Sequence, residues 1–178
     1  MILNIHGFMG VADNRNFQAL QGLCQGEELL SPKLDYLRQS PGEILAALSA
    51  AIQGAKGPVL LVGQSLGGWF ANQLSLRFCL PCILTNPCLQ PWECDLIVQS
   101  PIPPRFLQDY QKARCASPNP LARVLCSRQD EVLPNNIPRC QALTEHVRLV
   151  NGSHSDLENR GPELKALVDL WRGEQQVL

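Results

Sequence analysis

The chain has 178 residues, of which 45% are hydrophobic and 17% charged, and its formal net charge is −1. These values are typical of a single compact domain, expected over residues 1–178, and exclude a disordered chain. Lysines and arginines are scattered along the sequence, and without a basic cluster we expect no nucleic-acid partner.

The N-terminal residues, Met1 to Gly7, lack the basic segment and apolar stretch of a secretory signal peptide. No apolar run approaches the ~20 residues that a membrane-spanning helix needs, so we expect no membrane span. Together these patterns predict a cytoplasmic location.

Eight cysteines are present, most of them beside apolar residues. In a cytoplasmic protein of this size we expect them to be buried as small hydrophobic side chains rather than joined in disulfides. Cys79 and Cys82 have the spacing of a redox or zinc motif, yet they lie between a predicted helix end and a strand start. Because no second pair at metal spacing accompanies them, we expect no metal and no cofactor.

Short apolar runs recur along the chain, mostly as the continuous stretches typical of strands buried on both faces. They are Ile2–His6, Glu28–Leu30, Val59–Val62, Cys82–Thr85, Ala122–Cys126 and Val147–Val150. Segments with helical signals lie among them, namely the capping box Ser40–Glu43 continuing to about Ala55, Ser65–Cys79, Pro134–Leu143 and Pro162–Trp171. This alternation predicts an α/β fold, a three-layer α/β/α sandwich with a mainly parallel sheet of about six strands.

The first strand ends at His6, and Gly7 and Phe8 follow it. A His-Gly pair followed by a large residue here resembles the hydrolase loop that supplies one amide of the oxyanion hole. In this interpretation Phe8 donates its backbone N–H, Met9 lines the site, and His6 orders the loop rather than accepting protons.

The segment Gly63-Gln64-Ser65-Leu66-Gly67 follows the third strand and opens a helix. A G-x-S-x-G motif at a strand-to-helix turn is the arrangement of a nucleophile elbow, whereas the alternative is a glycine-rich turn that only packs. Such a turn strains the serine backbone, and side chains at its two outer glycines would collide across it. Ser65 is thus the predicted nucleophile, and the Leu66 N–H is the second predicted oxyanion donor.

Residues 86–120 hold seven prolines and form an unusually long connection. Long excursions of this kind are often lids or binding loops, and a short helix is expected near Phe106. Because this lid-like segment leaves the fourth strand at the predicted active edge, we expect it to form one wall of an acyl pocket, with Trp92 and Phe106 binding substrate. The alternative is a crossover helix with ragged ends.

The three histidines differ in their places relative to the strands. In a parallel sheet, catalytic groups gather beyond the carboxyl ends of the strands. His146 precedes the last strand and belongs to the opposite edge. His154 follows that strand and is the predicted general base.

An acid must hold the imidazole of this base in the right tautomer. Asp130 follows the fifth strand at the active edge and is the predicted acid. Glu131 is its adjacent rival, and Asp35 and Asp156 have less suitable positions. The order Ser, Asp, His, with each residue just beyond a different strand, favours a functional triad.

These motifs resemble the α/β-hydrolase superfamily, and their layout is most similar to its small single-domain bacterial esterases with an N-terminal His-Gly-Phe strand. The resemblance extends over nearly the whole chain, from Ile5–Phe8 through Gly63–Gly68 and Asn86-Pro87 to Asp130–Leu133 and Gly152–His154. It implies esterase or thioesterase activity without a cofactor. The segment after Phe8 and the Pro-rich segment depart from the family pattern, so the resemblance does not specify the substrate.

The expected function is hydrolysis of a carboxylic ester or thioester with a small or medium acyl group, by a serine esterase or thioesterase. Ser65 attacks the carbonyl, His154 takes its proton, and water then resolves the acyl-enzyme. One alternative is an acyltransferase, in which another nucleophile replaces water. The other is a non-catalytic binding protein that retains the hydrolase fold, which a complete triad disfavours. The natural substrate and the oligomeric state do not follow from the residues.

Overall fold

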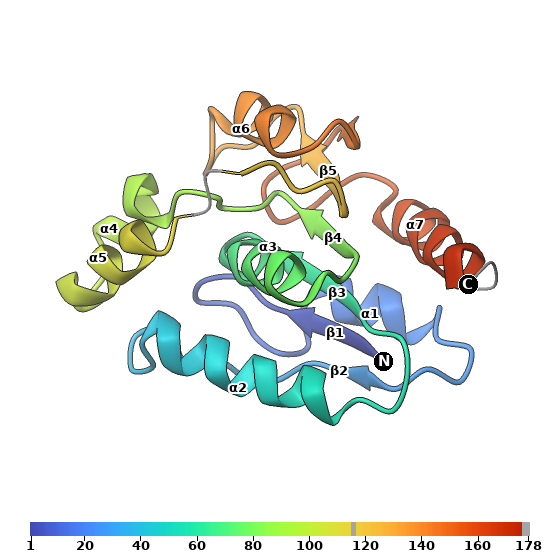
Figure 1. The fold of residues 1–178 in the computed structure, drawn as a ribbon. Coiled ribbons are helices and arrows are strands. Elements are labelled where there is room, and N and C mark those ends of the chain that lie inside the picture. The colour runs from blue at the N-terminus through green and yellow to red at the C-terminus, as the bar shows by residue number, and fades with distance from the viewer. Residues whose placement is uncertain (115–116, 176–178) are drawn as a thin grey trace.

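The computed structural model describes residues 1–114 and 117–175, and its fold is an α/β sandwich of three layers (Figure 1). The central sheet has the strand order β2-β1-β3-β4-β5-β6, and each neighbouring pair is parallel. Its strands are β1 (Ile2–Ile5), β2 (Leu29–Leu30), β3 (Leu60–Gln64), β4 (Cys82–Thr85), β5 (Ala122–Ser127) and β6 (Val147–Val150). The predicted fold class is therefore confirmed, with β2 shorter than expected.

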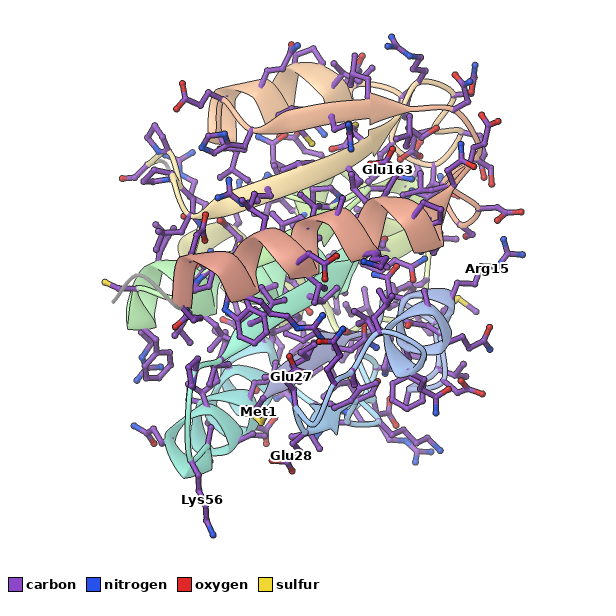
Figure 2. The ribbon with its side chains drawn as sticks, turned by 90° about the vertical axis from the view of Figure 1, so that its right-hand side faces the viewer. Met1, Arg15, Glu27, Glu28, Lys56 and Glu163 are labelled. Atoms are coloured by element: carbon purple, nitrogen blue, oxygen red, sulfur yellow. The ribbon has the colours of Figure 1, made fainter. Side chains whose placement is uncertain are left out.

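Helices cover both faces of the sheet (Figures 1 and 2). One face carries α2 (Pro41–Gly54), α3 (Leu66–Phe78) and α6 (Asn136–Leu143), and the other carries α1 (Arg15–Gln21) and α7 (Arg160–Gln175). Successive strand residues point into the two cores in turn: Leu3 and Ile5 belong to one core and Ile2 to the other. Because both faces are covered, most strand positions are apolar in succession rather than alternately.

The capping box predicted at the start of α2 is present. The Ser40 hydroxyl accepts the Glu43 N–H at 3.3 Å, and the Glu43 carboxylate accepts the Ser40 N–H at 2.7 Å. The helix α1 was not predicted, because its few residues are mostly polar and show little periodicity. Its beginning is nevertheless marked by an N-cap, since the Asn14 side chain accepts the Phe17 N–H at 2.9 Å.

The Pro-rich segment contains three short helical elements: η1 (Pro91–Glu93), α4 (Asp95–Val98) and α5 (Pro104–Lys112). The helix α5 is docked on α3 through aromatic rings, with Tyr110 edge-to-face against Trp69 at a centroid distance of 4.8 Å. Phe106, on the same helix, is only 2% exposed and belongs to the hydrophobic core. The helix expected near Phe106 is thus present.

Most of the described cysteines are small buried groups, as expected. Five of the seven are buried, Cys24 is half-buried, Cys79 is exposed, and all seven are free thiols. Cys115 lies outside the described residues.

Candidate active site

Ser65 lies at the sharp turn between β3 and α3. Its φ of 52° and ψ of −121° form a combination that residues with a side chain rarely adopt. Three main-chain hydrogen bonds hold it: the Ser65 N–H donates to Thr85 O at 3.0 Å, and Ser65 O accepts from Gly68 and Cys88, each at 2.9 Å. The strained conformation is therefore maintained by contacts to β4 and to the start of the Pro-rich segment.

Gly67 packs against the strand on the other side of this turn. A Cβ atom there would lie 2.1 Å from the Ile5 carbonyl oxygen and 2.6 Å from that of His6. These oxygens belong to the last residue of β1 and the residue that follows it. This part of the chain is buried and cannot move without disturbing the sheet. The close approach of α3 to β1, which places Ser65 beside the loop after β1, thus depends on the absence of a side chain.

We expect Gly67→Ala to lower the free energy of unfolding by about 3 kcal/mol, as overpacking a core does. Urea unfolding at neutral pH measures the change. The matched control is Gly54→Ala near the end of α2, where a Cβ would meet nothing within 4 Å and the change should stay within about 1 kcal/mol. Equal effects of the two substitutions would contradict the packing account.

The side chains of Ser65, His154 and Asp130 form a chain of hydrogen bonds. His154 Nε2 lies 2.9 Å from Ser65 Oγ, and His154 Nδ1 lies 2.9 Å from both carboxylate oxygens of Asp130. An ionised carboxylate only accepts, so Nδ1 carries the imidazole proton and Nε2 is free to accept the serine proton. The His154 and Asp130 side chains are only 7% and 3% exposed, which excludes most water from the pair.

Asp130 and its rival Glu131 make different contacts with the histidine. Asp130 Oδ1 also accepts the N–H groups of Val132 and Leu133 at 3.0 and 2.8 Å, which holds the carboxylate in place. Glu131 accepts the main-chain N–H of His154 at 2.9 Å and makes no hydrogen bond with the ring. The structure therefore assigns the ring contact to Asp130 and a loop contact to Glu131.

Asn86 is a site residue that the sequence analysis missed. Its side chain accepts the Ser127 N–H at 2.7 Å and donates to the His154 carbonyl at 2.9 Å, so it joins the end of β5 to the histidine loop. It is fully buried, with a φ of 42° in the left-handed region. An Asn-Pro pair directly after the fourth strand was the signal that could have identified it.

The loop after β1 packs against Ser65. A Cβ on Gly7 would lie 2.9 Å from the Ser65 Cβ, so only glycine allows this approach. Among the described residues, neither the Phe8 N–H nor the Leu66 N–H donates to a protein acceptor. Leu66 is the first residue of α3, where N–H groups have no partner within the helix. Met9 follows Phe8 in this loop with a 77% exposed side chain.

His6 is buried beneath this loop and orders it. Its Nε2 accepts the Leu34 N–H at 3.0 Å, so the proton resides on Nδ1, which donates to the Gly7 carbonyl at 2.8 Å. The Tyr36 hydroxyl donates to the main-chain carbonyl of His6. Burial lowers the pKa of the His6 imidazole, partly opposed by the bond to Gly7. Both ring nitrogens are thus engaged, and His6 lies outside the Ser65–His154–Asp130 chain.

The lowered pKa of His6 predicts acid sensitivity. The unfolded chain, with an ordinary histidine pKa of about 6.5, binds the proton before the folded chain does. The stability that the neutral His6 imidazole contributes is therefore fully present above about pH 6.5. It is lost as the pH falls towards the lower pKa of His6 in the folded chain. Between pH 7.5 and 5.5 the wild-type Tm should fall further than that of His6→Gln, whose amide oxygen can still accept the Leu34 N–H. Equal falls by calorimetry would contradict this role.

A hollow with a volume of about 520 Å³ lies between α3, η1, the end of α5 and α6. Trp92 lines it, and its role in substrate binding stays a prediction. Phe106 does not line it, since its side chain is packed in the core, and its expected role in substrate binding is not retained. Ser65 is not among the lining residues.

The described residues show neither a metal-binding cluster nor a membrane-spanning helix. In residues 1–114 and 117–175, no three or more His, Cys, Asp or Glu side chains are grouped so that they could hold a metal ion. No helix in the same ranges is both long and apolar enough to cross a bilayer.

Comparison with known proteins gives both a sequence and a structural match. The sequence pattern of the uncharacterised protein family UPF0227 matches residues 1–97. Alpha/beta hydrolase domain-containing protein 10 from mouse is similar in structure, with a TM-score of 0.74 and 17% sequence identity over 98% of this chain and 90% of that chain.

Two bacterial enzymes have the same fold. Est1E from Butyrivibrio proteoclasticus, solved with ferulic acid, has a TM-score of 0.70 and 14% identity, covering 99% of this chain and 89% of its own. A pyrethroid hydrolase from Sphingobium faniae has a TM-score of 0.61 and 17% identity, covering 94% and 95%. These similarities confirm the α/β-hydrolase fold that the sequence motifs predicted.

Proposed function

The chain belongs to the uncharacterised protein family UPF0227, and we propose that it is a serine hydrolase that cleaves a carboxylic ester or thioester. The observation that carries this proposal is the hydrogen-bonded chain from Ser65 Oγ through His154 to Asp130, with links of 2.9 Å. A serine hydroxyl is a weak nucleophile, and a base oriented by a third group is the usual means of activating it. All three groups lie beyond the carboxyl ends of parallel strands, where this fold gathers its chemistry.

In the proposed first step, Ser65 Oγ attacks the carbonyl carbon while His154 Nε2 accepts its proton. Asp130 holds the proton on Nδ1 and stabilises the imidazolium that forms. The imidazolium then protonates the leaving alcohol or thiol, which leaves an acyl group on Ser65. Water, deprotonated by the same nitrogen, attacks the acyl-enzyme and releases the acid.

The negative charge on the carbonyl oxygen needs donors that are already oriented. Phe8 follows Gly7, which lies against Ser65, and Leu66 directly follows Ser65; neither N–H is used by another protein group among the described residues. We assign them to the oxyanion, because one such donor contributes roughly 10²–10³-fold to kcat. The exposed side chain of Met9, next to Phe8, would contact the leaving alcohol or thiol, or the nucleophile that replaces it.

Nitrophenyl esters and thioesters of increasing acyl length test the proposal. The purified protein should hydrolyse short and medium esters at an unchanged rate in the presence of EDTA, because every proposed catalytic group is a side chain or main-chain amide. The same preparation of Ser65→Ala should not. Loss of turnover on chelation that zinc restores would contradict the proposed mechanism.

Adding an acyl acceptor distinguishes hydrolysis from the related possibility of acyl transfer. If water resolves the acyl-enzyme, adding alcohols or amines should leave the yield of free acid nearly constant. An acyltransferase would convert most of the acyl group to the acceptor product at low acceptor concentration.

A further inference from the structure

Two residues that line the hollow of about 520 Å³ are tied to the turn at Ser65. Trp69, in its wall, lies on the first turn of α3, four residues after the N-cap Ser65 and about 6 Å along the helix axis. Leu89, also in the wall, follows Cys88, whose N–H binds Ser65 O at 2.9 Å. One end of the hollow is therefore about one helical turn from Ser65.

The other end lies deeper along α3. Gln73 lines the hollow eight residues after Ser65, which at 1.5 Å per residue is about 12 Å along the helix axis. The Gln73 side chain donates to the Ala113 carbonyl at 2.9 Å, and the next residue, Arg114, also lines the hollow. Arg114 thus lines the part of the hollow beside Gln73.

The charged side chains of the hollow have a positive balance, although the whole chain has a net charge of −1. They are Arg114, Arg139 and Glu93, and the last two form an ion pair at 2.6 Å with side chains 30% and 47% exposed. A half-exposed carboxylate of this kind can be displaced by another anion at little cost, since exposed ion pairs contribute little stability. Arginine is well suited to such an exchange because its planar guanidinium binds carboxylate and phosphate through two parallel hydrogen bonds.

The lining of the hollow also suits an extended chain with polar groups. Trp92 and Leu89 offer apolar surface. The buried side-chain oxygen of Gln90, another lining residue, has no hydrogen-bond partner among the described residues. A buried unpaired acceptor is costly, and an N–H or O–H on a bound chain would satisfy it.

We propose that this hollow binds the anionic end of the substrate, with Arg139 and Arg114 as specificity-determining residues. The substrate class is then an ester or thioester that carries a carboxylate or phosphate several bonds from the scissile carbonyl. This inference rests on the proposed hydrolase function and adds where the charged end of the substrate lies: the ester lies at Ser65, and the anion lies in the hollow beside α3. A cationic ligand is disfavoured, because it would face two guanidinium groups and one carboxylate that is already paired.

The test compares nitrophenyl monoesters of dicarboxylic acids of increasing length with the neutral methyl esters of the same compounds. For the wild type, the ratio of charged to neutral kcat/KM should rise with length and pass through a maximum. Arg139→Gln and Arg114→Gln should each lower that maximum by about tenfold through KM, the pattern of lost binding rather than lost chemistry. Glu93→Gln should raise it, because the competing carboxylate is gone.

Arg148→Gln is the matched control. Arg148 also pairs with a glutamate, Glu163, which lies on α7 over the opposite face of the sheet (Figure 2). This variant should leave the ratio unchanged. A second arm uses butyrate esters with charged or neutral phenol leaving groups, and shows whether the anion belongs to the acyl or to the leaving group.

The outcomes separate the two proposals. If neutral esters are hydrolysed but neither Arg139→Gln nor Glu93→Gln changes the charged-to-neutral ratio of kcat/KM, the hollow does not bind the anion. This inference is then wrong, while the hydrolase proposal stands. If the wild type hydrolyses neither neutral nor charged esters, the proposed function itself is contradicted, and this inference with it. Opposite changes for Arg139→Gln and Glu93→Gln, with Arg148→Gln unchanged, support it.

Discussion

Ser65→Ala and His154→Ala should each lower kcat for a nitrophenyl ester by about 10⁴-fold or more. Ser65 Oγ and His154 Nε2 are 2.9 Å apart, and either group is of little use to the reaction without the other. The double variant should therefore be little worse than either single variant. When two residues act as a unit, removing one of them already abolishes their joint contribution. Initial rates at pH 8 measure all three.

His146→Ala is the control for removing an imidazole. His146 is partly exposed and lies before β6, at the edge of the sheet away from Ser65, so its removal should leave kcat unchanged. Tm values show whether each variant is folded. Losses that multiply in the double variant would mean that Ser65 and His154 act independently, which would contradict the triad.

Asp130→Asn should cost roughly 10³–10⁴-fold in kcat, because an amide at this place favours the imidazole tautomer that has its proton on the wrong nitrogen. The geometry of the site should otherwise persist, since an asparagine oxygen can still accept the Val132 and Leu133 N–H groups. Glu131→Gln should cost less than about tenfold, because the contact it alters is with the main chain of His154.

These two variants change one charge each at adjacent positions, and so each controls for the other. Steady-state kinetics on one ester, with Tm measured in parallel, separates catalytic loss from unfolding. A large loss in Glu131→Gln together with a small one in Asp130→Asn would show that the acid is Glu131 and that the assignment is wrong.

The fold was predictable because a parallel sheet with two covered faces requires apolar residues at consecutive strand positions. The runs that formed β1 and β3 to β5 largely meet that requirement, whereas β6, at the edge of the sheet, carries Arg148. Gly63–Gly67 marked the turn between β3 and α3. The helix α1 was missed because seven residues with two buried positions have no clear helical period. Its N-cap, Asn14, was the only strong local signal.

The order of the site residues along the chain was also informative, because each strand end delivers its loop to the same edge of the sheet. Sequence position could not show which way a long connection packs. Phe106 was expected in an acyl pocket, yet α5 turns it into the core against α3, while Trp92 lines the hollow.

Long-range contacts were the second limit. Asn86 and Ser127 are 41 residues apart in sequence, and although the Asn86-Pro87 pair marks the end of the fourth strand, nothing local shows which strand end its amide joins. The charge of the hollow likewise arises only when η1, the end of α5 and α6 are brought together, since Glu93 and Arg139 are 46 residues apart. Such features follow from tertiary packing and required the structure.

The central claim is that Ser65 is an activated nucleophile, and covalent labelling with a fluorophosphonate tests it most directly. The reagent phosphonylates serines that a neighbouring base has activated, and it needs no knowledge of the natural substrate. We predict one adduct per chain by intact mass, located on Ser65 by peptide sequencing, absent in Ser65→Ala and much slower to form in His154→Ala. An unlabelled wild-type protein, or an adduct on another residue that persists in Ser65→Ala, would contradict the account.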